Sequence, residues 1–281
     1  MIRFFALCTS AALLVGCGAP GGAKDPPPKP PAAGVILLNL RSGAFVRQAT
    51  VGDDPLAVSL APDGKTAYVV DNDLGDVFAL QLPSLRQTWR THVGGAPGPV
   101  LVAGDHLYVS EYDAGLAAEL DRRTGRLLGT QPVGPHPGEL VFWQGKVTAA
   151  NGAGFGLAVA SGSLWTWGRL PAQPGLHPFW LQAGQGSELL VTEEGQPEDT
   201  AAGAVLSLDT ATGAATTLAT PRDPDQAVRS GSDVFVAAHG DRDVLVLRGG
   251  KALTWARGAE VVALAADPQL NLLVVVTDAN E

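Results

Sequence analysis

Four residues that could bind a metal ion each stand directly before a proline, at Asp54, His136, His177 and Asp223. Imidazole and carboxylate groups brought to one place could hold Zn²⁺ or another divalent ion, which would support hydrolytic chemistry. Asp-Pro and His-Pro are also common starts of turns, where the side chain caps the local backbone. Both interpretations of these four positions remain open from the sequence.

A second group of candidate residues consists of acids that follow short β-rich runs. Because their positions recur along the chain, we expect them on loops at one face of the fold, where they would bind a cation or a basic partner. The residues of this predicted binding surface are Asp71, Asp73, Glu111, Asp113, Glu193 and Asp241. The alternative is an ordinary solvated face, because loops are polar in most proteins.

Short β-strands are the elements that would position the four candidate metal ligands and the acids of the predicted binding surface. From Gly34 onward, brief apolar runs alternate with turns rich in Gly, Asp, Asn and Pro, a pattern typical of all-β folds. Residues 55–95 show one unit of four such runs. Units of this kind recur with a period of about 40–46 residues, as in propeller repeats. The five complete units begin near Pro55, Gly98, Pro137, Pro178 and Pro224.

The two chain ends supply matching half units. Residues 261–265 and 272–276 fit the first two strands of a unit, and residues 35–40 and 44–51 fit the last two. A circular array of four-stranded sheets protects its edges when both termini share one sheet. We therefore predict a six-bladed β-propeller over residues 34–281, whose last blade is closed by the N-terminal strands in a 2+2 arrangement. Seven blades are the less favoured alternative.

The repeat motifs resemble those of a known family. Ala61-Pro62-Asp63-Gly64, Tyr68-Val69-Val70-Asp71-Asn72 and the Asp-x-x-Thr-Gly turns at 121–125 and 209–213 are similar to the YVTN-type repeat of bacterial surface propellers, which is related to NHL-like blades. The resemblance implies a propeller. It implies no particular activity, because propellers host both binding and catalysis.

The N-terminal region predicts export and lipid attachment. A basic start, Met1-Ile2-Arg3, precedes an apolar run that is shorter than the roughly 20 residues needed to span a bilayer. Leu14-Val15-Gly16-Cys17 resembles the lipobox of bacterial lipoproteins, in which the cysteine thiol receives a lipid. The resemblance implies a signal peptide over 1–16, lipidation at Cys17 and a Pro/Gly-rich tether over 17–33. It also implies an extracytoplasmic, membrane-anchored location, on the periplasmic side or at the cell surface; a secretory signal with a chance cysteine is the alternative.

Composition narrows the classes of partner and chemistry. The chain has a formal net charge of −9 at pH 7, which disfavours nucleic acid as a partner. Its two cysteines, Cys8 and Cys17, both precede the predicted propeller. Disulfides, thiolate metal sites and a cysteine nucleophile are therefore excluded from the folded body.

These features together predict a lipid-anchored binding or scaffold module of the cell envelope. We expect a monomer that contacts the membrane through its lipid and has an envelope protein or a glycan as its partner. No catalytic motif is recognisable, which favours a role other than catalysis. The alternative is a metal-dependent hydrolase similar to lactonases and esterases, with a divalent ion as cofactor at the axial mouth, held by Asp54, His136, His177 and Asp223. Six-bladed lactonases and arylesterases, which this alternative resembles, hold their ion in that region.

Overall fold

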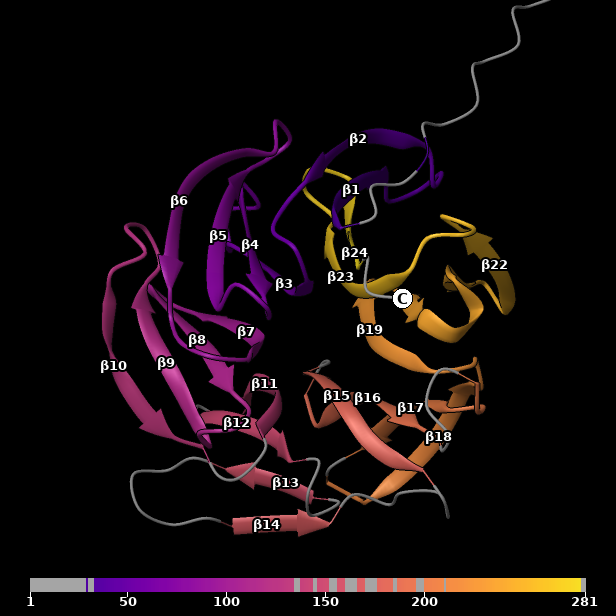
Figure 1. Cartoon of the computed structure of the whole chain (residues 1–281). Helices are drawn as coiled ribbons and strands as arrows, with labels where there is room; N and C mark the ends of the chain where they lie inside the picture. Colours follow the sequence, from indigo (N-terminus) through magenta and orange to yellow (C-terminus); the bar gives the residue numbers. More distant parts are fainter. Residues whose placement is uncertain are drawn as a thin grey trace, which may run out of the picture.

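Strands make up almost all of the regular structure (Figure 1). The structure is a computed structural model, and it describes residues 29, 33–133, 137–143, 146–151, 156–159, 166–169, 176–183, 186–195, 200–209 and 211–278. Within these residues one short 3₁₀ turn, η1 (His239–Asp241), accompanies the strands. The all-β class predicted from the sequence is confirmed.

The strands of the first half of the chain are short and evenly spaced. They are β1 (Gly34–Asn39), β2 (Phe45–Thr50), β3 (Pro55–Leu60), β4 (Thr66–Asp71), β5 (Asp76–Gln81), β6 (Arg86–His92), β7 (Pro97–Ala103), β8 (His106–Glu111), β9 (Leu116–Asp121), β10 (Leu127–Pro132), β11 (Pro137–Trp143) and β12 (Lys146–Asn151).

The second half continues the same pattern to the end of the described chain. Its strands are β13 (Gly156–Val159), β14 (Thr166–Arg169), β15 (His177–Ala183), β16 (Glu188–Glu194), β17 (Ala204–Asp209), β18 (Ala214–Ala219), β19 (Pro224–Ser230), β20 (Asp233–Ala238), β21 (Asp243–Arg248), β22 (Lys251–Trp255), β23 (Val261–Asp267) and β24 (Leu272–Thr277).

The sheets fall into two kinds. Five are blades of four consecutive strands, β3–β6, β7–β10, β11–β14, β15–β18 and β19–β22, and one further sheet, in the order β2-β1-β24-β23, is shared by the two ends of the chain. The sequence prediction counted this shared sheet as the sixth blade. Counted as blades formed by one continuous segment, the propeller has five blades, not six or seven. We call the shared sheet the closing sheet, because its halves come from residues 34–50 and 261–277.

The closing sheet contains the pairing that was predicted between the chain ends. β1 runs antiparallel to β24 with Val35 opposite Val276 and Leu37 opposite Val274. β24 in turn pairs with β23, so β24 has a strand on each side. The sheet therefore fills the gap between the first and the last blade (Figure 1).

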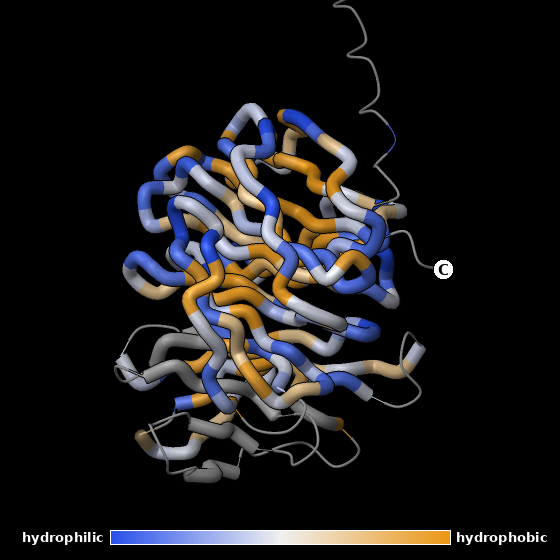
Figure 2. The backbone as a smooth tube through the Cα atoms, turned by 60° about the vertical axis from the view of Figure 1, so that its left-hand side comes forward, coloured by the Kyte–Doolittle hydropathy of each residue, from blue (hydrophilic) through white to orange (hydrophobic). Residues whose placement is uncertain are grey.

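Both faces of β1 are buried. Because side chains alternate between the two faces of a strand, neighbouring residues pack against different blades. Ile36 packs in a core with Phe235 of the blade β19–β22. Leu37 packs in a second core with Phe78 of the blade β3–β6. Figure 2 shows the same division along the chain, with hydrophobic stretches in the inner strands and hydrophilic residues at the turns. Through these two cores the closing sheet packs against both neighbouring blades and so connects the first blade to the last.

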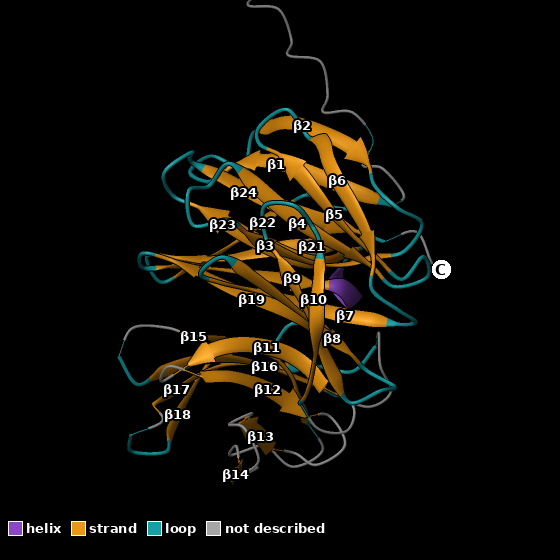
Figure 3. Ribbon diagram, turned by 90° about the vertical axis from the view of Figure 1, so that its left-hand side faces the viewer, coloured by secondary structure: helices purple, strands orange, loops and turns teal. Residues whose placement is uncertain are grey.

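Each of the five blades places its first strand at the axis and its last strand at the rim, and the closing sheet places β23 at the axis and β2 at the rim (Figure 1). Every side chain of the rim strand β10 is exposed. In side view the loops gather at the two ends of the strands, and η1 lies toward the side where the chain ends (Figure 3). The axis is therefore lined by β3, β7, β11, β15, β19 and β23.

The Asp-x-x-Thr-Gly motifs form tight turns between the third and fourth strands. The Asp121 carboxylate accepts hydrogen bonds from the Thr124 hydroxyl at 2.8 Å and the Thr124 backbone N–H at 2.9 Å. Asp209 accepts a hydrogen bond from the Thr212 hydroxyl at 2.9 Å. These contacts explain why the motif recurs, since Asp and Thr satisfy the backbone where the chain reverses.

The predictions for the N-terminal region lie almost wholly outside the described residues. The predicted signal peptide over 1–16, Cys17 and most of the tether over 17–33 are not among the residues described. Within the described part of the chain, no helix has the length and apolar character required to cross a membrane.

Candidate functional site

The six acidic residues of the predicted binding surface differ widely in exposure. Asp73 and Asp113 are exposed, Glu111 and Asp241 are half-buried, and Asp71 and Glu193 are fully buried. Asp241 accepts hydrogen bonds from the backbone N–H of Arg222 at 3.0 Å and from its guanidinium at 2.7 Å. For Asp73 and Asp113 a role in binding remains a prediction.

Asp71 organises two loops. Its Oδ2 accepts hydrogen bonds from the backbone N–H groups of Asp53 and Asp54, at 2.6 and 2.9 Å. Its Oδ1 accepts a hydrogen bond from the N–H of Leu74 at 2.8 Å. The carboxylate thus ties the loop that enters β3 to the loop that leaves β4, and it is directed into the protein rather than toward a partner.

The four predicted metal ligands are not found as one group. His136 is outside the described residues, and His177 begins β15 with a side chain that is not described. Asp54 is half-buried in the loop that Asp71 organises. Asp223 is buried and belongs to a different group of metal-type ligands, formed with Asp225 and His239.

The group of Asp223, Asp225 and His239, which we call the His239 cluster, lies where β19 begins and β20 ends. One ligand atom from each residue lies within 4.8 Å of the others. His239 Nδ1 is 3.7 Å from an oxygen of Asp223 and 3.5 Å from an oxygen of Asp225. On the other side of the ring, Nε2 is 3.8 Å from an oxygen of Glu260, which also pairs with Arg242. A carboxylate behind a histidine is a common arrangement around a metal ion, because it orients the ring.

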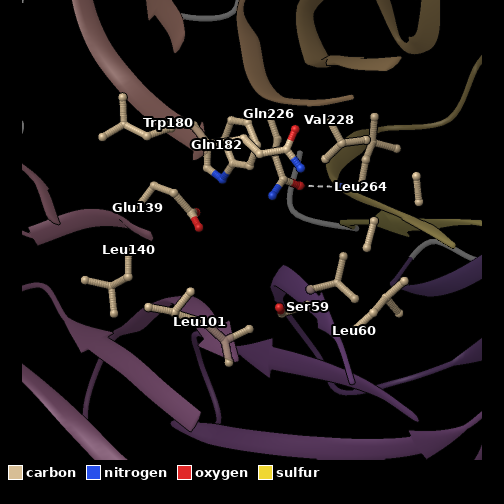
Figure 4. A pocket seen from close by; sticks show the side chains of 15 residues that line it. Ser59, Leu60, Leu101, Glu139, Leu140, Trp180, Gln182, Gln226, Val228 and Leu264 are labelled. Atoms are coloured by element: carbon tan, nitrogen blue, oxygen red, sulfur yellow. Dashed lines mark hydrogen bonds between the residues drawn. The ribbon is translucent and has the colours of Figure 1, made fainter. Parts of the chain in front are cut away.

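A pocket of about 320 Å³ lies on the axis of the propeller. All six axial strands contribute to its walls, where aliphatic side chains such as Leu60, Leu101, Leu140 and Val228 alternate with polar ones (Figure 4). We call this cavity the axial pocket. Its volume is at the lower end of the range for sites that take small organic molecules.

The polar side chains of the axial pocket include one carboxyl group. Glu139 of β11 is only 7% exposed. Burial raises the pKa of Glu139 well above its usual range, and the nearby Trp180 indole and Leu140 backbone N–H groups oppose this rise only in part. Trp180 is also buried, and its indole nitrogen has no hydrogen bond of standard geometry. Figure 4 shows the Trp180 and Glu139 side chains pointing toward one another.

Two glutamines complete the polar part of the axial pocket. The side-chain oxygen of Gln226 accepts a hydrogen bond from the backbone N–H of Leu264, which leaves its amide nitrogen directed into the pocket (Figure 4). The side-chain oxygen of Gln182 accepts a hydrogen bond from the backbone N–H of Arg229 at 2.7 Å. Among the residues described around the pocket, none is Lys, Arg or His.

Sequence reasoning missed most of these functional candidates. The signal for Glu139 is a polar residue inside a first strand whose other residues are apolar or glycine. Gln226 lies in a strand with other polar residues and had no such signal. The signal for the His239 cluster is the Asp223-Pro224-Asp225 triplet at the start of one strand and His239 directly after the next strand. These sequence patterns gain their meaning only from the structure, because it shows which distant segments lie next to one another.

Comparisons with known proteins identify the fold and no family. No protein-family model and no curated protein matches the chain. A streptogramin B lyase structure matches with a TM-score of 0.60 and 12% identity, over 87% of this chain and 98% of that one. Virginiamycin B lyase from Staphylococcus aureus, solved with quinupristin, matches with a TM-score of 0.59 and 12% identity, over 86% and 98%.

A third solved structure comes from a different kind of protein. The β-propeller domain of Swd1 from Myceliophteria thermophila matches with a TM-score of 0.55 and 11% identity, over 81% of this chain and 97% of that one. At such low identities, the likeness of all three structures shows a β-propeller and carries no activity with it.

Proposed function

We propose that this chain is a lipid-anchored binding module of the bacterial cell envelope, on the extracytoplasmic side of a membrane. In this proposal, residues 1–16 are a signal peptide, Cys17 carries the lipid, residues 17–33 are a tether and residues 34–281 are a propeller with YVTN-type repeats. The lipobox-like residues Leu14-Val15-Gly16-Cys17 support the anchor. The acidic net charge of −9 supports a partner other than nucleic acid.

The observation that carries the binding function is the axial pocket. A buried carboxyl with no cationic side chain among the described lining residues, an indole nitrogen without a hydrogen bond of standard geometry and an amide nitrogen lie in one pocket, together with aliphatic side chains. Buried polar groups are normally hydrogen-bonded, so a site with unmet groups is suited to a ligand that completes them. Envelope proteins or glycans bound at the exposed loops are compatible with the same role.

The anchor is tested by changing Cys17 to serine in the full chain, expressed in a bacterium with its own N-terminus. We expect the unchanged protein in the membrane fraction and the Cys17→Ser protein released from it, because lipid chains supply the attachment. Mass spectrometry of the mature N-terminal peptide should show the lipid on Cys17. A Cys8→Ser variant is the matched control and should stay in the membrane fraction. Equal membrane retention of Cys17→Ser and Cys8→Ser would refute the anchor.

The His239 cluster favours a second candidate function, a metal-dependent hydrolase of lactones or esters. In this alternative Asp223, Asp225 and His239 hold a divalent ion such as Zn²⁺, and Glu260 orients His239. The ion would polarise an ester carbonyl or activate a water molecule. The cluster fits Zn²⁺ in its donor types, since carboxylate and imidazole are both common zinc ligands.

Zinc titration of the purified full chain, after treatment with a chelator, tests the second candidate. We expect Zn²⁺ at a hundredfold excess over its Kd to stabilise the fold by about 2.7 kcal/mol, seen as a higher melting temperature. His239→Ala should lose this shift. His92→Ala should keep it, because His92 is an exposed histidine beside Asp76, away from the cluster. The same shift in His239→Ala as in the unchanged chain would remove the metal site, and with it the hydrolase.

A further inference from the structure

The Glu139 carboxyl lies in the axial pocket without a cationic side chain beside it. It is 7% exposed, and the described residues around the pocket include no Lys, Arg or His. Burying an ionised carboxylate without a partner is costly, so buried acids are normally paired, metal-bound or protonated. Burial raises the pKa of the Glu139 carboxyl and so favours its protonated form. A ligand that brings a positive charge would supply the missing partner.

The remaining groups in the pocket restrict the kind of cation. A metal ion takes several oxygen ligands, six to eight for Ca²⁺, and Glu139 is the one carboxyl among the described lining residues. Part of the wall is aliphatic, with Leu101, Leu140 and Val228 among its lining residues (Figure 4). Apolar walls suit a ligand with a hydrocarbon body. The combination indicates an organic cation rather than a metal ion.

An anionic ligand fits the pocket poorly. The Trp180 indole could donate a hydrogen bond to an anion, but it points toward the Glu139 carboxyl (Figure 4). The whole chain is acidic, with a net charge of −9, which attracts cations and repels anions over a distance. The Trp180 indole and the Leu140 backbone N–H are better placed to stabilise the Glu139 carboxylate once a cation has ionised it.

We propose that the axial pocket binds a small primary ammonium ion with an aliphatic body, whose charge pairs with Glu139. This inference rests on the proposed binding function and names its ligand class. The ammonium N–H groups donate to the Glu139 carboxylate, while the Trp180 indole and the Leu140 backbone N–H donate to the same carboxylate from the protein side. The hydrocarbon body lies against the aliphatic walls, and Ser59 offers a hydroxyl on the β3 side of the cavity (Figure 4).

The test uses n-butylammonium, n-butanol and butyrate as three ligands of similar size and different charge. Their binding to the purified full chain is measured at pH 7.5 by isothermal titration calorimetry. We expect n-butylammonium to bind at least tenfold more tightly than n-butanol or butyrate. Glu139→Gln, which keeps the size of the side chain, should weaken n-butylammonium at least tenfold. Glu119→Gln in β9 changes a half-buried carboxyl outside the pocket and should leave the affinity unchanged.

A second variant keeps the proposal testable if Glu139→Gln fails to fold. Leu101→Trp fills the cavity from β7 and keeps the Glu139 side chain itself, and it should also abolish n-butylammonium binding. Thermal unfolding of each variant reports whether it is folded. Equal affinity for n-butanol and n-butylammonium, unchanged affinity in Glu139→Gln, or no binding of n-butylammonium to the unchanged chain would each overturn the inference. Fractionation of Cys17→Ser is independent of all three results, so the lipid anchor of the proposed function is judged separately.

Discussion

Val274→Pro in β24 is expected to abolish the cooperative unfolding of the propeller. Val274 is fully buried at the centre of the closing sheet, opposite Leu37 of β1 on one side and Ala265 of β23 on the other. Proline removes a backbone donor from the hydrogen-bond ladder and occurs in sheets essentially only at edge strands or bulges, not in a central strand. Loss of this strand also separates the two chain ends and exposes both adjoining cores. Native proteins have only about 5–15 kcal/mol of stability to lose.

Thermal unfolding followed by circular dichroism measures this effect. The matched control is Val46→Pro in β2, because Val46 is exposed and lies at a register shift in an outer strand, where proline is tolerated. We expect Val46→Pro to melt within a few degrees of the unchanged chain and Val274→Pro to show no transition. A cooperative transition in Val274→Pro close to that of Val46→Pro would show that the ring does not depend on the closing sheet.

Asp71→Ala is expected to reduce the free energy of unfolding by about 2–4 kcal/mol. The Asp71 carboxylate accepts three backbone hydrogen bonds, from Asp53, Asp54 and Leu74, and it is fully buried. Leaving a buried donor unsatisfied costs about 1–3 kcal/mol, and the loops can relax enough to recover part of this. The effect should be seen as a lower urea midpoint with an unchanged slope.

The control for Asp71→Ala comes from the same loop. Asp73 is exposed, so Asp73→Ala should change the stability by no more than about 0.5 kcal/mol. Asp71→Asn keeps one acceptor oxygen and should fall between the two alanine variants. If Asp71→Ala and Asp73→Ala unfold at the same urea concentration, Asp71 does not organise the loops.

The propeller could be predicted from the sequence because its signals are local. The Asp-x-x-Thr-Gly turns satisfy their own backbone within a few residues, as Asp121 and Thr124 do. Alternating apolar residues mark the strands, and the two half units at the ends could be matched by position. The pairing of Val35 with Val276 follows from that match. The blade count needs the correction given above, because the closing sheet is not one continuous segment.

The functional groups could not be predicted in the same way, because they depend on contacts between distant segments. Asp71 and Asp73 look alike in the sequence, yet one binds backbone N–H groups of a loop 17 and 18 residues away and the other is exposed. Glu139 becomes notable only when six axial strands enclose it without a cation. His239 meets Asp223 and Asp225 because β19 and β20 are antiparallel neighbours.

A crystal structure of the chain grown with n-butylammonium at pH 7.5 tests most directly whether an organic cation forms an ion pair with the Glu139 carboxylate. We predict ligand density in the axial pocket, with the ammonium nitrogen about 2.7–2.9 Å from a Glu139 carboxylate oxygen and the hydrocarbon chain against Leu101 and Val228. An empty pocket, or a ligand whose nitrogen is directed away from Glu139, would contradict this account.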